Sequence, residues 1–326
     1  MSAFPSFARR LLTGVTLACA VSAVAAQEAY PSRSVEWVVP YAPGGGTDIV
    51  ARVLAKQMES DLGQTMVIVN KPGAATSIGA DYVARAKPDG YTMLSADTAT
   101  LAANPFIYAS LPYDPEKNFD SVGLTVRFPM ILVVNPSVPA NNLEEFLAWA
   151  KGQEEVAYAT PGPGSPHHLA TELFREMTGL KLSHIPYRGA APAVQDVVSG
   201  QVPMMFVDTA SGQQFIAANR LRAIGIASAK RVEGFSDIAT LNEQGLNNFE
   251  AYAWQGLVVP AGTPEEPIKK LNASLLKALQ SDEVKERLTA MGLELTPSSP
   301  EEMDAYGKAE REKWGPLIKS AGIKAD

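Results

Sequence analysis

Residues 35–62 of this chain read VEWVVPYAPGGGTDIVARVLAKQMESDL, and this stretch decides the fold. The apolar run from Val35 to Pro40 predicts a strand, and the glycines from Gly44 to Gly46 predict a tight turn. From Thr47 to Leu62 apolar side chains recur at helical spacing, which predicts a helix with one buried face. A strand, a glycine-rich turn and an amphipathic helix in this order are typical of α/β proteins with largely parallel strands.

The same order of elements recurs along the chain. We expect a first βαβαβ unit with strands at 35–40, 66–70 and 91–96 and helices at 47–62 and 78–86. We expect a second unit with strands at 156–160, 182–186 and 202–207 and helices at 167–178 and 191–199. Because 326 residues exceed a typical single domain, the two units predict two lobes, each a mostly parallel sheet flanked by helices.

Two further strands are predicted to join the lobes as hinges, at 131–135 and at 253–260. We therefore expect the first lobe to comprise 27–128 and 253–326, and the second lobe to comprise 129–252. The tail is predicted to be helical at 264–290 and 300–319, with charged outer faces, and to pack on the first lobe.

Residues 1–26 have the features of a secretory signal peptide. Arg9 and Arg10 supply positive charge, Leu11 to Ala20 form an apolar stretch, and Val24 to Ala26 offer small residues for cleavage. A spanning helix needs about 20 apolar residues, and no segment of the chain approaches that length, so we expect no membrane-spanning segment. Cleavage before Gln27 would place the mature chain in the periplasm.

The chain has a single cysteine, Cys19, which lies inside this leader. Cleavage would therefore leave no cysteine, which excludes disulfides, thiolate metal sites and a cysteine nucleophile. A lipid anchor on Cys19 is the alternative. It is disfavoured because Thr16 stands where lipoprotein signals usually carry leucine.

The composition, with 46% hydrophobic and 19% charged residues, is that of an ordinary globular protein. The formal net charge is −7, and no run of lysine or arginine could follow a phosphate backbone, so we expect no nucleic-acid partner. An acidic chain that binds an anion must do so through a local site.

Two glycine-rich loops are candidates for such a site. The loop 43–48 follows a strand and opens a helix, so its backbone N–H groups can face an anion. It lacks the lysine of a phosphate-binding loop and the third glycine of a dinucleotide fingerprint, which favours a small carboxylate. The loop 160–166 occupies the same position in the second unit, and ligands of open α/β sheets bind at this end of the strands. The alternative for the first loop is an ordinary turn in which Thr47 or Asp48 caps the helix.

Two other polar positions remain open between binding and structural roles. Arg188, in the third strand-to-helix loop, is a possible carboxylate partner or a solvated side chain. Asp208 ends the last strand of the second unit and either meets the ligand or caps the following helix.

An enzyme is a further class of function to weigh, since Ser165, His168 and Asp208 are the residue types of a hydrolytic triad. The Gly-x-Ser-x-Gly nucleophile turn is absent: residues 162–167 read Gly-Pro-Gly-Ser-Pro-His, with a proline where the turn into the helix begins. His167 and His168 are adjacent and point to different helix faces, which disfavours a metal site. We expect no catalytic residue, no metal and no cofactor.

Taken in order, short motifs over essentially the whole mature chain resemble the tripartite tricarboxylate transporter substrate-binding receptors, the Bug proteins of Bordetella and its relatives. The matching stretches are 30–33, 39–48, 70–73, 87–92, 111–114, 133–136, 184–189, 200–202, 260–264 and 313–314.

The resemblance implies a type II periplasmic-binding fold, in which two α/β lobes joined by two strands hold a carboxylate through backbone amides and water. Carried to this sequence, the implied ligand-binding residues are Gly45, Gly46, Thr47, Gly164, Ser165, Tyr187 and Asp208. It implies a monomer that hands a small carboxylate to inner-membrane transporter subunits, or alternatively presents it to a sensor kinase.

Two departures from the family pattern affect the expected ligand. Asp97 stands where relatives commonly carry a small or hydroxyl residue, and Gln255 stands where an aromatic residue is usual. We include Asp97 among the expected site residues, with capping of the next segment as its alternative role. A dicarboxylate, an amino acid and an aromatic acid all stay open as ligands.

Overall fold

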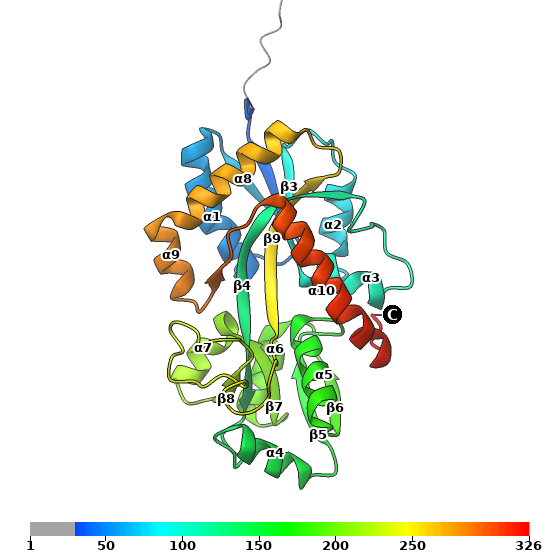
Figure 1. Ribbon diagram of the computed structural model, residues 1–326, viewed down its shortest axis with the longest axis vertical. Helices are drawn as coiled ribbons and strands as arrows, with labels where there is room; N and C mark the ends of the chain where they lie inside the picture. Colours follow the sequence, from blue (N-terminus) through cyan, green and yellow to red (C-terminus); the bar gives the residue numbers. More distant parts are fainter. Residues whose placement is uncertain (1–29, 326) are drawn as a thin grey trace, which may run out of the picture.

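The computed structural model describes residues 30–325, and these form two α/β lobes joined by two long strands (Figure 1). The predicted signal peptide, residues 1–26 with Cys19, lies outside the described residues. Among residues 30–325, no helix is both long enough and apolar enough to cross a membrane.

The first lobe begins as a parallel βαβαβ unit, as the sequence predicts. Its elements are β1 (Val35–Val39), α1 (Gly46–Leu62), β2 (Met66–Asn70), α2 (Ser77–Ala84), β3 (Thr92–Asp97), the π-helix η1 (Ala99–Ala103) and α3 (Asn104–Ile107). Strand β1 pairs in parallel with both β2 and β3. Helix α1 buries Val50, Leu54 and Met58 and ends at Gly63, whose φ of 67° lets its N–H reach the Glu59 carbonyl.

The second lobe repeats this plan. Its elements are α4 (Leu143–Lys151), β5 (Val156–Thr160), α5 (Pro166–Thr178), β6 (Leu182–Pro186), α6 (Ala190–Ser199), β7 (Met204–Asp208), α7 (Thr209–Ala217) and β8 (Arg222–Ile226). Strand β5 pairs in parallel with β6 and β7, whereas β7 and β8 pair antiparallel with the joining strand β4 (Phe119–Val134). Each lobe therefore has a parallel portion, and the antiparallel joining strands lie between the two portions.

Strands β4 and β9 (Tyr252–Pro260) run antiparallel and connect the lobes. From Phe119 to Pro129, β4 pairs with β9, and from Met130 onward it pairs with β7 and β8. The pairing partner of β4 thus changes between Pro129 and Met130. The predicted strand at 131–135 is only the second half of β4; the first half was missed because two irregularities against β9 break the alternation of inward and outward residues.

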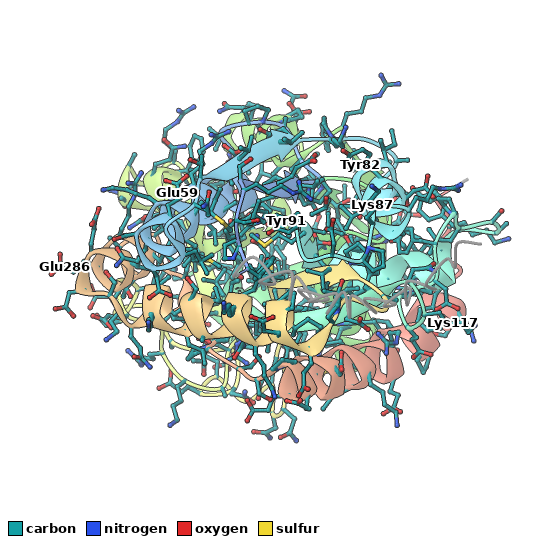
Figure 2. All side chains as sticks on the ribbon, turned by 90° about the horizontal axis from the view of Figure 1, so that it is seen from above. Glu59, Tyr82, Lys87, Tyr91, Lys117 and Glu286 are labelled. Atoms are coloured by element: carbon teal, nitrogen blue, oxygen red, sulfur yellow. The ribbon has the colours of Figure 1, made fainter. Side chains whose placement is uncertain are left out.

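The C-terminal part returns to the first lobe. It comprises α8 (Glu265–Gln280), α9 (Asp282–Thr289), β10 (Glu294–Leu295) and α10 (Pro300–Ser320). Helix α8 packs on α1 and β4, while α10 packs on β4 and η1, and α10 also touches α5 of the second lobe. Seen from above, α1 and α9 lie on one flank with Glu59 and Glu286, opposite α2 with Tyr82 (Figure 2).

One apolar cluster continues through both lobes. It contains Leu94 of the first lobe, Met130 and Trp254 at the joining strands, and Phe206 of the second lobe. Trp254 also donates through Nε1 to the Glu310 carboxylate of α10 at 3.0 Å. The joining strands are therefore packed into the core rather than exposed as a free linker.

Candidate functional site

A cavity of about 770 Å³ lies between the lobes, where the strand-to-helix loops of both meet. Every site residue that the sequence predicts lies on its wall: Gly45, Gly46, Thr47, Asp97, Gly164, Ser165, Tyr187 and Asp208. A cavity of this size suits a small organic molecule.

The N-terminus of α1 opens onto this cavity without a side-chain cap. Its N-cap is Gly45, which has no side chain to offer, and neither Thr47 nor Asp48 caps the helix as the alternative interpretation required. Asp48 instead accepts hydrogen bonds from the Gly44 N–H and from Arg52, both at 2.9 Å. The first N–H groups of a helix have no partner within the helix, so this end presents donors to the cavity.

Asp48 keeps that loop in shape. Although burial opposes ionisation, hydrogen bonds from Arg52, Gly44 and Asn70 hold the pKa of Asp48 below its ordinary value. On the cavity side, Thr47 Oγ1 accepts a hydrogen bond from Gln255 Nε2 at 2.8 Å, which links the loop to β9. The first turn of α1 is therefore held in place by neighbours rather than by a cap.

The second loop uses most of its own donors. The Ser165 hydroxyl donates to the Gly162 carbonyl at 2.8 Å and accepts from the His168 N–H, which makes Ser165 the N-cap of α5. The Gly164 N–H donates to His168 Nδ1 at 3.2 Å, and Pro166 has no N–H to give. The expected pair of donor-lined loops is thus unequal: the second loop shapes the wall more than it offers amides.

The N-terminus of α6 supplies the donors that the sequence reasoning missed. Its N-cap is Gly189, with φ of 112° and no side-chain cap, and Ala190 and Ala191 lie on the cavity wall. Arg188, the carboxylate partner that the sequence suggests for this loop, lies on the same wall with an exposed side chain. The signal in the sequence was a glycine before a run of alanines, with no Ser, Thr, Asp or Asn in the capping position.

Asp97 forms part of the first-lobe wall and is only 7% exposed. It accepts the Thr100 N–H at 2.9 Å, so it does cap the following segment, and it also accepts a hydrogen bond from the Tyr41 hydroxyl. Burial raises the pKa of Asp97 above its ordinary value in spite of these bonds. Capping and facing the cavity are therefore compatible roles for this residue.

Asp208 and His167 form a pair on the second-lobe wall. His167 Nε2 lies 3.3 Å from Asp208 Oδ2, and Asp208 Oδ1 accepts the Ser211 N–H at 2.9 Å as the N-cap of α7. Burial disfavours the charged carboxylate, but the His167 hydrogen bond and charge outweigh it and lower the pKa of Asp208. His167 Nδ1 is buried and has no hydrogen-bond partner among residues 30–325.

The hydrolytic arrangement considered for Ser165, His168 and Asp208 is not assembled. His168 accepts from Gly164 and stacks on His184 with ring centroids 3.9 Å apart, while Asp208 pairs with His167. Within the described part of the chain, no group of three or more His, Cys, Asp or Glu side chains is placed to hold a metal ion. The arrangement is that of a cavity with amide donors from α1 and α6 on its wall.

Comparison with known proteins gives consistent matches. Residues 50–323 match the model of the tripartite tricarboxylate transporter family receptor. BugT from Bordetella pertussis is 34% identical over 320 residues, which cover 97% of this chain and 98% of BugT.

Solved structures match over nearly their whole length. A Rhodopseudomonas palustris protein with adipate has a TM-score of 0.84 at 33% identity, covering 90% of this chain and 99% of that one. The periplasmic binding protein BugD gives 0.80 at 36% identity, covering 90% and 99%. MatC from Rhodopseudomonas palustris, with bound malate, gives 0.79 at 32% identity, covering 89% and 100%.

Proposed function

Because the chain belongs to the tripartite tricarboxylate transporter receptor family, we propose that it captures a small carboxylate between its lobes in the periplasm and delivers it to membrane subunits of a transporter. The observation that carries the proposal is the pair of uncapped helix N-termini, of α1 and α6, on the wall of one interlobe cavity. Adipate and malate, bound by the two Rhodopseudomonas palustris relatives, are both carboxylates.

Backbone donors account for a useful share of the binding free energy. A helix N-terminus contributes roughly 0.3–1 kcal/mol per favourable charge at exposed sites and up to about 2 kcal/mol when partly buried. Charge-assisted hydrogen bonds to the same N–H groups add about 1.5–3 kcal/mol each. Micromolar affinity needs about 8 kcal/mol, so two helix ends with a few such bonds are of the right order.

The binding residues divide between the lobes. In the first lobe we assign the amides of Gly45, Gly46 and Thr47, and in the second the amides at the start of α6. Gly164, Ser165, Tyr187 and Asp208 then form the second-lobe wall, where the Tyr187 hydroxyl already donates to Asp196 at 2.6 Å. We infer that Gly164, Ser165 and Tyr187 shape this wall, while Asp208 adds a carboxylate to it.

We expect the two lobes to close around the ligand, because both of them contribute to its site. A ligand held by both lobes favours the closed arrangement by its greater affinity for it, and hinges of this kind are a few residues that absorb the change in backbone angles. We propose lobe boundaries at 128/129 and 252/253, next to the change of pairing in β4 and to the start of β9.

The test is to identify the ligand and to follow closure. Native mass spectrometry of freshly purified protein, followed by a thermal-shift panel of carboxylates, should yield a carboxylate that is recovered chemically unchanged. Small-angle scattering should then show compaction when that compound is added. Turnover of the compound, or stabilisation by no carboxylate at all, would contradict the receptor function.

A further inference from the structure

The charged groups around the cavity are unevenly distributed. Among the described residues on its wall the only lysine or arginine is Arg188, whose side chain is exposed. Asp97 and Asp208, in contrast, are only 7% and 8% exposed. A second carboxylate on a ligand would therefore find no buried lysine or arginine on this wall.

Asn104, at the start of α3, adds an unpaired acceptor. Its Nδ2 donates to the Ala75 carbonyl at 2.7 Å and lies 3.1 Å from the Tyr113 hydroxyl, which donates its own hydrogen to the Thr100 carbonyl. These bonds decide the orientation of the amide, because the reverse orientation would set two oxygens against each other at Ala75. Asn104 Oδ1 is then a fully buried acceptor without a partner among the described residues.

Asp97 and Asn104 belong to one hydrogen-bonded group, which we call the first-lobe floor: Tyr41, Asp97, Thr100, Asn104 and Tyr113. Thr100 connects its two halves, because it donates to Asp97 and accepts from Tyr113 through its carbonyl. The hydrogens of both tyrosine hydroxyls are already used inside the group. What the floor has left to offer a ligand is acceptors, namely the Asp97 carboxylate and Asn104 Oδ1.

The cavity wall thus has amide donors at the N-termini of α1 and α6, the His167–Asp208 pair on the second lobe, and acceptors at the first-lobe floor. We propose that the ligand of this chain carries, besides its carboxylate, a hydrogen-bond-donating group such as an ammonium or a primary amide, which Asp97 and Asn104 accept. This inference rests on the proposed function and narrows it.

A simple dicarboxylate fits this wall less well. Its second carboxylate would meet Asp97 at short range in a partly desolvated cavity, where like charges repel strongly and no buried lysine or arginine compensates. It would also leave Asn104 Oδ1 without a donor, and a buried acceptor without a partner costs free energy. In this respect the chain is expected to differ from its relative that was solved with adipate.

The test is calorimetric titration of ligand-free protein with matched compounds. The probes are succinate, glutarate and adipate, each beside its monoamide, which has nearly the same shape but ends in a donor. We expect the monoamide of the best-fitting length to bind at least about tenfold more tightly than its dicarboxylate. A factor of this size corresponds to one hydrogen bond donated to a charged group, here the Asp97 carboxylate.

The variant Asp97→Asn should remove most of that preference, because asparagine keeps the size of the side chain and an acceptor for the Thr100 N–H but loses the charge. Asp81→Asn is the matched control, since Asp81 pairs with Arg85 outside the cavity wall. A circular-dichroism melt checks that each variant folds. The wild-type ranking alone decides the matter if Asp97→Asn does not fold.

Two different results would overturn the inference, and only the second would also overturn the proposed function. If a dicarboxylate binds as tightly as its monoamide in the wild type, the donor requirement is wrong while the carboxylate receptor stands. If no compound of the whole carboxylate panel binds, aromatic acids and amino acids included, the proposed function itself fails and the inference fails with it.

Discussion

Gly45→Ala tests whether backbone amides hold the ligand carboxylate. Gly45 has an ordinary φ of −78°, and an added Cβ would come no closer than 3.8 Å to a neighbouring atom, the Ala42 carbonyl oxygen. Folding should therefore change little, by about 0.5–1 kcal/mol, since alanine is a poorer N-cap than glycine. Because Gly45 lies on the cavity wall, however, the new methyl group should keep the carboxylate from the first N–H groups of α1.

The expected loss of binding is about 2 kcal/mol, or roughly thirtyfold in Kd, which corresponds to one charge-assisted hydrogen bond. Calorimetric titration with the identified ligand measures it, and chemical denaturation of the same variant separates binding from stability. Gly307→Ala in α10 is the matched control, because its Cβ would lie 3.6 Å from Arg311 and the residue is not on the cavity wall. It should bind like the wild type.

Arg188→Ala tests whether backbone N–H groups or the Arg188 side chain hold the ligand carboxylate. The Arg188 side chain is exposed, and exposed ion pairs contribute up to about 1 kcal/mol, so its loss should weaken binding less than Gly45→Ala does. Normal binding by Gly45→Ala together with a large loss in Arg188→Ala would refute the reasoning, since a side-chain cation would then hold the ligand.

Three other predictions use separate features of the chain. Gly164→Ala should destabilise the protein by at least about 1–2 kcal/mol in denaturant titrations, because Gly164 has φ of 70° and an added Cβ would lie 2.6 Å from Ile107 Cδ1; unchanged stability would mean that the loop can relax. Burial lowers the pKa of His168 from 6.5 to about 3, so only the unfolded state takes up this proton between those values. The contribution of His168 to the free energy of unfolding should therefore be complete above pH 6.5 and fall by roughly 4 kcal/mol as the pH drops towards 3. In pH-dependent denaturation, His168→Asn should remove this part of the pH dependence. Finally, intact-mass measurement of exported protein should give an N-terminus at Gln27, and a lipidated Cys19 would contradict the predicted leader.

Local patterns in the sequence were sufficient for much of the fold. The predicted strands at 66–70, 156–160 and 182–186 agree with β2, β5 and β6, because short apolar runs bounded by turn residues depend on near neighbours alone. The glycine-rich loops were recognised for the same reason, and all the predicted site residues came to lie on one cavity wall. The first half of β4 was missed because its irregularities against β9 arise from pairing with a distant strand.

Only the tertiary structure determines which partner each polar side chain contacts. His167 and His168 are adjacent in the sequence, yet the packing of α5 turns the first toward Asp208 and the second toward His184. The free acceptor of Asn104 likewise exists only because Ala75 and Tyr113, from other segments, occupy its amide nitrogen. The sequence shows which groups can donate or accept hydrogen bonds. Which of those groups remain unpaired and available to a ligand depends on neighbours brought together from distant parts of the chain.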